Sequence, residues 1–429
     1  MKAVILAADK GTRVRPLTNE MAPFALGSAG GMHKSQDFGG FFDETTVGLR
    51  DDAIAADVGR PLRIMMIGLR GFPGVQGGVE THAEHLCPLL AEMGCDVTVL
   101  ARSPYQPADI GPEWKGVKFV PLWAPKSKGL ETILHSFLGV LYAAVMRPDI
   151  LHIQAIGPAI MTLPARLLGL RVVVTHHGPD YDRQKWGRFG RFVLRLGEHC
   201  GMRWSNGRIV ISKVIADLVR RKHGVEPALI TNGVVLPQIP FSVDALAAHG
   251  LVRGKYVLLV SRLVREKRHL DLIEAFSRAA LPGWKLVLVG ASDHPDAYVK
   301  EVMAAAVRNP DVVMTGFQKG TALQELYAHA GLFVLPSSHE GLPIAMLEAL
   351  SYGLPVVASD IPANLEVGLK PESYFPLGNV DALVSCIEHH VRAAPGDGER
   401  KALHAWVGDK YDWRRIARQT LDLYRNIVR

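Results

Sequence analysis

The sequence predicts an α/β protein with two doubly wound, parallel-sheet domains that face each other across a cleft. The chain has 429 residues, more than a single hydrophobic core usually organises. Apolar residues make up 48% of it and charged residues 21%, which excludes a disordered, collagen-like or disulfide-scaffold protein. From residue 63 onward, short β-branched runs alternate with helical patterns in two series, which is typical of βαβ units around a parallel sheet.

The two series define the expected strands. The first series gives Arg63–Gly68, Asp96–Leu100, Lys118–Leu122, Asp149–Gln154, Arg171–His176 and Arg208–Ser212. The second series gives Lys255–Val260, Lys285–Gly290, Asp311–Thr315, Leu332–Pro336 and Pro355–Ser359. Between the series, residues 232–251 contain turn residues and two prolines without a strong period, so the domain boundary belongs there. We therefore expect a first domain at 62–236, a second domain at 237–412 and a terminal helix at 413–429.

Other features bear on where the protein works. The four cysteines are scattered without a C-x-x-C pair, which argues against a zinc site or a disulfide framework and favours a reducing compartment. The start of the chain lacks the pattern of a signal peptide. The apolar stretch Ile133–Val145 is interrupted by His135 and Ser136, so we interpret it as a buried core helix. We expect a cytoplasmic protein, with peripheral contact to the inner face of the cell membrane left open.

The net charge of +7 is concentrated in one segment. Residues 1–60 sum to −1, residues 61–236 to +8 and residues 237–429 to 0. The excess gathers at Arg183, Lys185, Arg188, Arg191, Arg195 and Arg203. Such a cluster fits a phosphate-bearing partner or an anionic membrane on the acceptor side of the protein, and a solvated helix face is the alternative. Nucleic acid is not expected as a partner, because no aromatic residues are interleaved with these cations.

Two glycines open the first predicted helix. Gly77 and Gly78 follow the strand Arg63–Gly68 and precede an amphipathic segment. Adjacent glycines at a helix start let backbone amides approach an anion, and the helix dipole favours negative charge there. A diphosphate is the functional interpretation, and a plain turn is the structural one.

Charged residues follow two strands of the second series. Arg262 and Lys267 come after Lys255–Val260, where a guanidinium and an ammonium can bracket a pyrophosphate. Glu340 and Glu348 follow Leu332–Pro336 and are eight residues apart. We expect Glu340 in the loop and Glu348 about a turn inside the next helix, where a carboxylate can accept hydrogen bonds from ribose hydroxyls.

These residues resemble a known family, the retaining glycosyltransferases of family 4, which have the GT-B fold of two Rossmann-like domains. The resemblance runs from about Leu62 to the end of the chain. It rests on the spacing of Glu340 and Glu348, on the glycine pair, and on three further segments, Ser261–Lys267, Asn232–Val234 and Thr315–Phe317.

The resemblance implies roles for these residues. Arg262 and Lys267 would stabilise the leaving diphosphate, with help from helix amides near Met346 and Leu347. Glu348 would hold the ribose and Glu340 the hydroxyls of the donor sugar. The backbone around Gly316 and Phe317 would line the base. The terminal helix 413–429 would pack back across the domains.

A histidine pair ends the strand Arg171–His176. By the resemblance, the T-x-H-G pattern matches Thr175, His177 and Gly178, so His177 is the expected contact to the donor sugar or the reaction centre. His176 is its nearest competitor. Asp180 and Asp182 form a D-x-D pattern that binds a divalent metal in another glycosyltransferase fold, but two carboxylates make a thin magnesium site. We predict no metal site and no cofactor, with the nucleotide sugar as a co-substrate.

The beginning of the chain resembles a second family. Residues 1–26 are similar to the opening of sugar-1-phosphate nucleotidyltransferases, but Ala8 and Asp9 stand where a glycine pair is expected in the phosphate loop. We interpret 1–26 as a degenerate fragment. Residues 27–61 are rich in Gly, Ser and Asp without a sustained period, so we expect a linker or a disordered segment there.

The function implied is transfer of a sugar from a nucleoside-diphosphate sugar to a saccharide or polyprenyl-linked acceptor during assembly of a bacterial surface polysaccharide. The anomeric configuration would be retained. Two alternatives remain open at this point, a nucleotide-sugar 2-epimerase of the same architecture and a non-catalytic nucleotide-sugar-binding protein. Base, sugar, acceptor, linkage and oligomeric state are not specified by the sequence.

Overall fold

The computed structural model describes most of the chain from Arg60 onward. The described residues are 60–105, 111–125, 130–183, 186–238, 240, 242–292, 296–393 and 396–429. Contacts group residues 60–429 into one unit, separate from residues 1–59. The nucleotidyltransferase-like fragment 1–26, and the predicted linker 27–61 apart from its last two residues, lie outside the described part of the chain.

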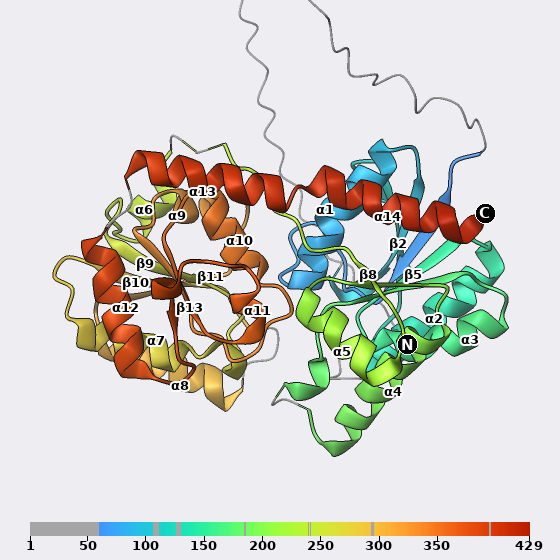
Figure 1. Cartoon of the computed structure of the whole chain (residues 1–429), viewed down its shortest axis with the longest axis horizontal. Helices are drawn as coiled ribbons and strands as arrows, with labels where there is room; N and C mark the ends of the chain where they lie inside the picture. Colours follow the sequence, from blue (N-terminus) through green and yellow to red (C-terminus); the bar gives the residue numbers. More distant parts are fainter. Residues whose placement is uncertain are drawn as a thin grey trace, which may run out of the picture. The chain divides into compact units, whose positions relative to one another are not determined.

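Two sheets organise the described residues, as the sequence predicts (Figure 1). The first has the order β3-β4-β2-β1-β5-β6-β7-β8, and only the β3–β4 pair is antiparallel. Its strands are β1 (Arg63–Ile67), β2 (Asp96–Arg102), β3 (Glu113–Trp114), β4 (Val117–Leu122), β5 (Ile150–Gln154), β6 (Val172–His176), β7 (Gly207–Val210) and β8 (Ala228–Leu229).

The second sheet is parallel throughout, in the order β11-β10-β9-β12-β13-β14. Its strands are β9 (Tyr256–Val260), β10 (Lys285–Val289), β11 (Val312–Gly316), β12 (Leu332–Leu335), β13 (Val356–Ser359) and β14 (Tyr374–Phe375). In both sheets the strand order runs outward in two directions from the first strand, β1 or β9. This confirms the doubly wound prediction and places a topological switch point at the carboxyl end of each first strand.

Helices join the strands and pack on the sheets. In the first domain they are α1 (Gly78–Glu92), α2 (Leu130–Met146), α3 (Thr162–Leu167), α4 (Arg188–Trp204) and α5 (Lys213–His223), with short 3-10 helices η1 (Ser103–Tyr105), η2 (Pro158–Met161) and η3 (Asp180–Asp182). From residue 244 onward they are α6 (Asp244–Ala248), η4 (Arg265–Lys267), α7 (His269–Ala279), α8 (Ala297–Arg308), α9 (Gly320–Ala328), α10 (Ile344–Ser351), α11 (Pro362–Leu365), η5 (Pro371–Ser373), α12 (Val380–Arg392), α13 (Asp397–Lys410) and α14 (Trp413–Val428).

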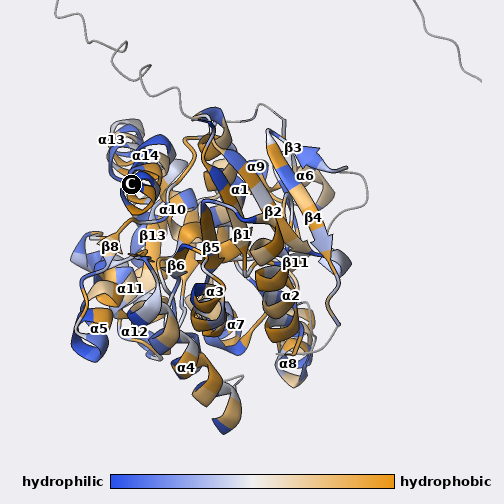
Figure 2. Ribbon diagram, turned by 90° about the vertical axis from the view of Figure 1, so that its right-hand side faces the viewer, coloured by the Kyte–Doolittle hydropathy of each residue, from blue (hydrophilic) through white to orange (hydrophobic). Residues whose placement is uncertain are grey.

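The central strands are apolar because helices cover both of their faces. β5 and β6 are buried at every position, and β6 reads Val-Val-Val before its polar end at Thr175 and His176. A parallel sheet covered on two sides has such continuous hydrophobic runs in place of an alternating pattern. Figure 2 shows these strands in orange at the centre of the molecule. The first polar residues after each run therefore lie at the carboxyl edge of the sheet, where the site is built.

The last helix connects the two halves of the chain. α13 packs on α10, near the second sheet, whereas α14 packs on α1, beside the first sheet (Figure 1). Asp412 caps α14 by accepting a hydrogen bond from the Arg415 amide at 2.6 Å. The buried face of α14 repeats at helical spacing with Trp413, Ile416, Ala417, Thr420, Leu421 and Tyr424. The Tyr424 hydroxyl lies 2.6 Å from Nδ1 of His152 in β5.

The interpretation of Ile133–Val145 needs a correction. The segment forms most of α2, and its inner face, which includes His135 and Val140, is buried against the sheet. Its outer face is exposed and apolar, with Phe137 at 46% and Val145 at 81% exposure. The helix is therefore a surface helix with an apolar outer face, which composition alone does not distinguish from a core helix. Among the described residues, no helix combines the length and apolar character that a membrane span requires.

Candidate active site

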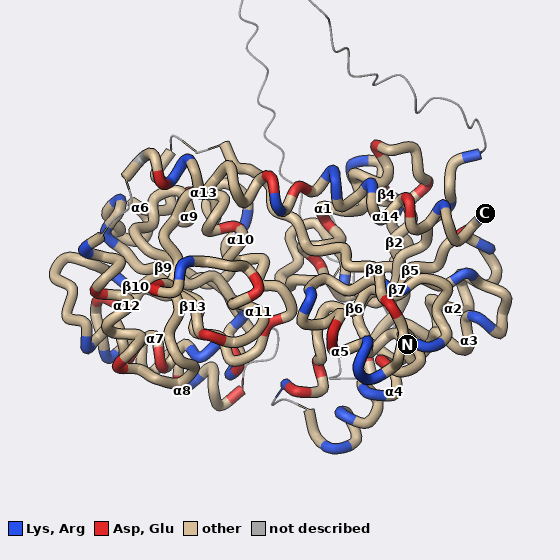
Figure 3. Tube along the Cα trace, viewed as in Figure 1, with Lys and Arg blue, Asp and Glu red and all other residues tan. Residues whose placement is uncertain are grey.

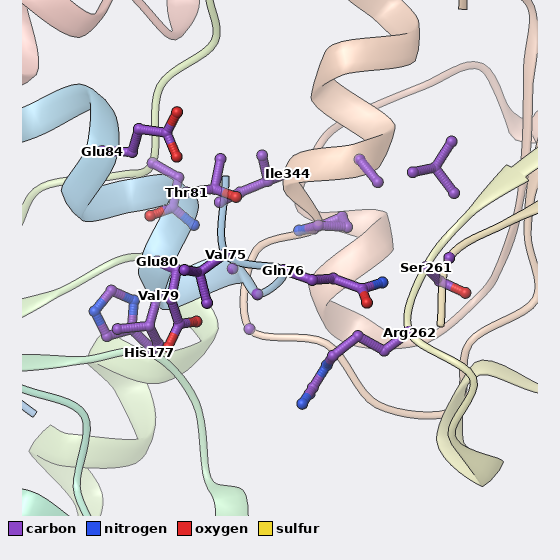
Figure 4. A pocket seen from close by; sticks show the side chains of 18 of the residues that line it. Val75, Gln76, Val79, Glu80, Thr81, Glu84, His177, Ser261, Arg262 and Ile344 are labelled. Carbon is purple, nitrogen blue, oxygen red and sulfur yellow. The ribbon is translucent and has the colours of Figure 1, made fainter. Parts of the chain in front are cut away.

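A cavity of about 1070 Å³ lies between residues at the carboxyl ends of the two sheets (Figure 4). Its walls come from the β1–α1 loop and the end of β6 on one side, and from the ends of β9 and β12 on the other. The predicted site residues that line it are Gly77, Gly78, His177, Arg183, Arg262, Lys267, Phe317, Glu340 and Glu348. The structure thus brings together residues that are up to 271 positions apart in the chain.

The backbone of the β1–α1 loop comes close to the opposite wall of the cavity, which is possible because its glycines have no side chains. Gly77 has φ 155°, and a β-carbon there would collide with the carboxylate of Glu80. A β-carbon on Gly78 would stand 4.0 Å from Ile344 Cδ1, on the opposite wall. Under the loop, Arg70 and Glu80 form a buried ion pair with Nε and Oε1 3.1 Å apart. Burial raises the pKa of Glu80, but the charge and hydrogen bonds of Arg70 lower it further, so the carboxylate stays ionised.

Arg262 is the cation at the end of β9. Burial lowers its pKa, and the positive charges of Arg183 and Arg70 lower it further. Its guanidinium has no hydrogen-bond partner among the described residues, and Figure 4 shows it extended into the cavity below Gln76. An arginine remains charged in proteins, so a partly buried guanidinium without a partner among the described residues is a site for an anion.

Lys267 and Glu340 form an ion pair across two loops of the second domain. The Glu340 side chain is 10% exposed and that of Lys267 18%. Burial raises the pKa of Glu340, but the adjacent Lys267 ammonium lowers it below its usual value. The Ser338 amide donates to the Glu266 carbonyl at 2.8 Å and fixes the two loops against each other. Glu340 is therefore an ionised, oriented carboxylate at the cavity wall.

α10 presents its amino end to the cavity. Pro343 stands before its first residue, and Ile344 and Ala345 line the cavity. The predicted role of Met346 and Leu347 needs a correction. Their amides donate to the Pro343 carbonyl, at 3.0 and 3.1 Å, and neither residue lines the cavity. The amides without intrahelical partners in a first turn are those nearest the start, so Ile344 and Ala345 are better placed for an anion.

Glu348 lies one turn inside α10. Its Oε2 accepts a hydrogen bond from the Tyr327 hydroxyl at 2.9 Å. Burial raises the pKa of Glu348 to about 7, the neighbouring Glu84 adds to this rise, and the Tyr327 hydrogen bond opposes it. In the empty cavity the carboxyl group therefore loses its proton near neutral pH.

Of the two residues predicted to line the base, Gly316 and Phe317, the structure places one at the cavity. Phe317 lines the cavity and is 42% exposed. Gly316 has φ 70°, and its carbonyl accepts a hydrogen bond from the Gly290 amide at 2.8 Å. Gly316 does not line the cavity. Its role is to let β11 turn sharply so that Phe317 reaches the wall.

His177 follows β6 directly. Its Nε2 lies 2.7 Å from Oε1 of Gln154, and its ring meets the His82 ring edge to face at 5.0 Å. Burial lowers the pKa of His177 to about 3, with smaller contributions from His152 and His176. The imidazole is therefore neutral, and it donates from Nε2 to the Gln154 oxygen.

His176, the alternative candidate, points the other way. It is fully buried, and its Nε2 lies 3.0 Å from Oε1 of Glu198. Tyr181, Lys222 and His223 contact the same carboxylate. His176 does not line the cavity, so its place is in a buried network below the loop that carries His177.

The D-x-D segment forms η3 at the cavity entrance. Oδ1 of Asp180 pairs with Nε of Arg183 at 2.9 Å, and both residues line the cavity, whereas Asp182 is exposed. Within the part of the chain that the structure describes, no three His, Cys, Asp or Glu side chains are grouped as metal ligands. Metal independence stays a prediction.

The remaining basic residues lie away from the cavity. Arg188, Arg191 and Arg195 are exposed on the first two turns of α4 and do not line it. Lys185 lies outside the described residues. The sequence analysis did not identify Arg70 or His339, which both line the cavity. His339 precedes Glu340 and has a buried Nε2 without a partner among the described groups.

Comparisons with known proteins agree with this geometry. The family model for group 1 glycosyl transferases matches residues 247–388, and the model for glycosyltransferase family 4 matches residues 76–237. The chain is 25% identical over 308 residues to the amylovoran biosynthesis glycosyltransferase AmsD of Erwinia amylovora, covering 70% of this chain and 81% of that protein. It is 26% identical over 406 residues to a glycogen synthase of Mycobacterium tuberculosis, covering 85% and 94%.

Solved structures share the fold. The sucrose-phosphate synthase of Thermosynechococcus elongatus matches with a TM-score of 0.72 at 22% identity, covering 86% of this chain and 99% of that one. Anabaena HepE, solved with UDP and glucose, matches with a TM-score of 0.68 at 18% identity, covering 84% and 98%. Two facing Rossmann-like domains with this cavity define a GT-B glycosyltransferase. Within that class, the chain belongs to glycosyltransferase family 4.

Proposed function

We propose that this protein transfers a sugar from a nucleoside-diphosphate sugar to a saccharide or polyprenyl-linked acceptor, with retention of the anomeric configuration and without a metal ion. The observation that carries the proposal is Arg262, a partly buried guanidinium without a hydrogen-bond partner among the described residues, in a cavity that both domains line. A diphosphate placed there would also meet Lys267 and the start of α10. These groups supply positive charge where a metal ion would otherwise be needed.

The reaction needs little covalent chemistry from the protein. The acceptor hydroxyl forms a bond to the anomeric carbon while the bond from that carbon to the phosphate oxygen breaks and its electron pair stays on the diphosphate. Arg262 and Lys267 stabilise this charge. The hydroxyl proton passes to the departing phosphate oxygen on the same face of the sugar. Positioning and leaving-group electrostatics then account for most of the catalysis.

Two contacts support retention without a protein nucleophile. Glu340 is held in an ion pair with Lys267, which directs its oxygens toward hydrogen bonding with sugar hydroxyls. His177 is neutral and held by Gln154, so it suits a hydrogen bond to the donor sugar and not attack at carbon. Glu348 lies where it can accept hydrogen bonds from the ribose, and Phe317 lies where it can contact the base.

The acceptor side faces the first domain. AmsD is by its name an enzyme of amylovoran biosynthesis, and this likeness supports a role in assembling a bacterial surface polysaccharide. The exposed cations of α4 suit an anionic membrane as a further partner. We therefore propose that the protein works in the cytoplasm, in peripheral contact with the inner face of the cell membrane.

Thermal-shift titration with UDP-, GDP-, ADP- and dTDP-sugars tests the donor site. One nucleotide class should raise the melting temperature of the wild type, because a ligand that binds only the folded state stabilises it. Arg262→Gln should remove most of this shift. Arg278→Gln is the matched control, because Arg278 lies on α7 of the same domain and pairs with Asp381 at the surface. The shift should persist in EDTA.

The outcomes separate the alternatives. If no nucleotide sugar stabilises the wild type, the donor site is wrong. If a sugar nucleotide binds and is converted to its epimer without an acceptor, the protein is an epimerase. If binding occurs but neither transfer nor epimerisation follows with a panel of saccharide and lipid-linked acceptors, the binding-protein alternative holds.

A further inference from the structure

The outer layer of the first domain has an unusual surface. Helices α2, α3 and α4 lie side by side, with η2 packed between α2 and α4. This layer, defined here as residues 130–147, 158–168 and 188–204, carries twelve of the twenty-four exposed large apolar side chains in the described chain. They are Leu130, Phe137, Leu141, Val145, Met146, Leu163, Leu167, Leu168, Phe189, Phe192, Leu196 and Trp204.

Several of these side chains are exposed well beyond the usual level for their type. Leu167 is 79% exposed, Val145 81%, Phe189 77% and Phe192 61%. Scattered exposed apolar residues are normal on a soluble protein, but this concentration on three adjacent helices is not. Such a surface indicates a partner that buries apolar groups.

The charges of the layer all have one sign at the surface. Its exposed cations are Arg147, Arg166, Arg188, Arg191, Arg195 and Arg203. Its two carboxylates, Glu131 and Glu198, are buried and engaged, with Arg102 and with Lys222 respectively. The described residues of the layer therefore expose arginines and no carboxylate, and Figure 3 shows the blue segments along α4.

α4 carries both exposed apolar side chains and exposed arginines within about two turns. Phe189, Phe192 and Leu196 recur at spacings of three and four, so they share one side of the helix. Arg188 and Arg191 lie beside them, and neither has a hydrogen-bond or ion-pair partner among the described residues. A helix with aromatic side chains flanked by unpaired arginines fits the interface of an anionic bilayer, where rings enter the headgroup region and guanidinium groups meet phosphates.

We propose that the layer of α2, α3 and α4 is a docking surface for an anionic membrane. This inference deepens the proposed function, because it supplies the route by which a lipid-linked acceptor reaches the cavity. Trp186, two residues before α4, lines that cavity, as do Leu194 of α4 and Thr132 of α2. A saccharide on a lipid held at this surface would therefore enter the acceptor side directly.

A second copy of the chain is a less suitable occupant. In a two-fold symmetric dimer the same surface would face itself, so arginines would oppose arginines without a carboxylate to pair with. Anionic lipids provide the opposite charge and the apolar environment together. The charge of the surface thus favours the bilayer over self-association.

Flotation of the full-length protein with vesicles tests the surface without any sugar substrate. Vesicles of phosphatidylcholine with 30% phosphatidylglycerol should bind the wild type at low salt, whereas vesicles of phosphatidylcholine alone should bind it weakly. Salt should weaken the binding, because it screens the arginines. Arg188→Gln with Arg191→Gln should lower the partition coefficient about 25-fold, from roughly a fivefold effect per arginine.

The apolar contribution needs its own variant and control. Phe189→Ser with Phe192→Ser should lower vesicle binding at least tenfold while the thermal shift with the donor nucleotide stays unchanged. Met303→Ser with Val307→Ser is the control, because these α8 residues of the second domain are 53% and 86% exposed. This control should bind vesicles as the wild type does.

The results distinguish this inference from the proposed function. If the wild type does not float with anionic vesicles, or if the α4 variants float equally well, the membrane surface is wrong, whatever the nucleotide binding shows. If sedimentation detects a dimer that the phenylalanine variants dissociate, the occupant is a second copy. If vesicles bind as expected but no nucleotide does, the membrane inference survives and the glycosyltransferase proposal fails.

Discussion

The carbonyl oxygen of His177 packs directly against the α-carbon of Gly341, across the line where the two domains meet. A β-carbon on Gly341 would collide with that oxygen, and one on Gly178 would stand 3.5 Å from the Gly341 α-carbon. His177 follows the last strand residue of β6 in the first domain, and Gly341 follows Glu340 in the second. The approach of the two backbones therefore fixes how closely His177 and Glu340 can lie.

We expect Gly341→Ala to impair turnover more than donor binding. The methyl group would hold the domains apart at this contact, while Arg262 and α10 remain intact for the nucleotide. A misplacement of this size costs about a hundredfold in rate. Steady-state kinetics with the identified donor would show a lower kcat with a nucleotide affinity near that of the wild type.

Gly398→Ala is the matched control for this substitution. Gly398 lies in α13, and nothing stands within 4 Å of an added β-carbon there. Its kinetics should equal those of the wild type. Equal kcat values for Gly341→Ala and Gly398→Ala would show that the contact between His177 and Gly341 does not limit catalysis.

The Lys267–Glu340 ion pair predicts that a second substitution restores the stability lost in a Lys267 variant but does not restore its activity. Lys267→Met leaves the Glu340 carboxylate buried without its cation, which we expect to lower the free energy of unfolding by about 3 kcal/mol. Adding Glu340→Gln removes that unpaired charge and should restore most of the stability. Urea denaturation measures this. The double variant should stay inactive, because both groups are needed at the donor sugar and diphosphate.

Glu348 predicts a pH dependence of donor binding. Its pKa of about 7 means that the ionised fraction rises about tenfold between pH 6 and pH 8. Ribose hydroxyls donate to the ionised form, so the affinity for a nucleotide sugar should rise by about that factor over this range. A nucleotide sugar is the right probe, because its diphosphate is esterified at both ends and does not titrate there.

The contribution of Glu348 to the free energy of unfolding changes with pH in the opposite direction to donor affinity. Because folding raises the pKa of Glu348 from 4.5, its contribution to stability is full below pH 4.5 and is lost as the pH rises through 7. His177 changes stability in the opposite sense over part of this window, because folding lowers its pKa from 6.5 to about 3, so stability is lost as the pH falls below 6.5. Glu348→Gln should bind the nucleotide sugar with a flat pH profile by calorimetry, and a profile as steep as that of the wild type would assign the titration to another group.

Glu198 predicts a large effect on stability from outside the cavity. Burial raises its pKa, but His176 and Lys222 lower the pKa to about 2, so its contribution is present above pH 4.5 and is lost only as the pH falls toward 2. At pH 7, Glu198→Gln should lower the free energy of unfolding by about 3 kcal/mol. Glu226→Gln, in an exposed pair with Arg220, should leave the free energy of unfolding nearly unchanged, because exposed ion pairs contribute little. Equal losses of stability in the two variants would mean that the buried contacts of Glu198 stabilise the fold no more than an exposed ion pair does.

The sequence predicts the sheets well because their strands are uninterrupted apolar runs. Eleven expected strands all have counterparts, with ends shifted by one or two residues. The three short strands β3, β8 and β14 were not anticipated, because two residues such as Glu113 and Trp114 carry no periodic signal. They form only by pairing with an edge that is already in place.

The sequence predicts which loops form the site, but not every side chain and amide that faces the cavity. Which histidine faces the cavity depends on Glu198, which lies 22 residues beyond His176 and becomes its partner only through folding. The choice of Met346 and Leu347 was two residues late, because α10 begins directly after Pro343 and its first free amides belong to Ile344 and Ala345. Arg70 had an available signal, since it is a cation between the first strand and the glycines.

The position of α14 has a consequence for biosynthesis. Trp413, Ile416 and Tyr424 complete the apolar cluster that α1 and β1 begin, so the core of the first domain is formed from both ends of the described chain. Domains generally fold from the amino end as a ribosome extends the chain. Here the side of α1 that packs on α14 stays uncovered until residues 413–428 have been translated. During synthesis, the apolar side of the first domain that α14 covers therefore stays exposed until the second domain has been translated.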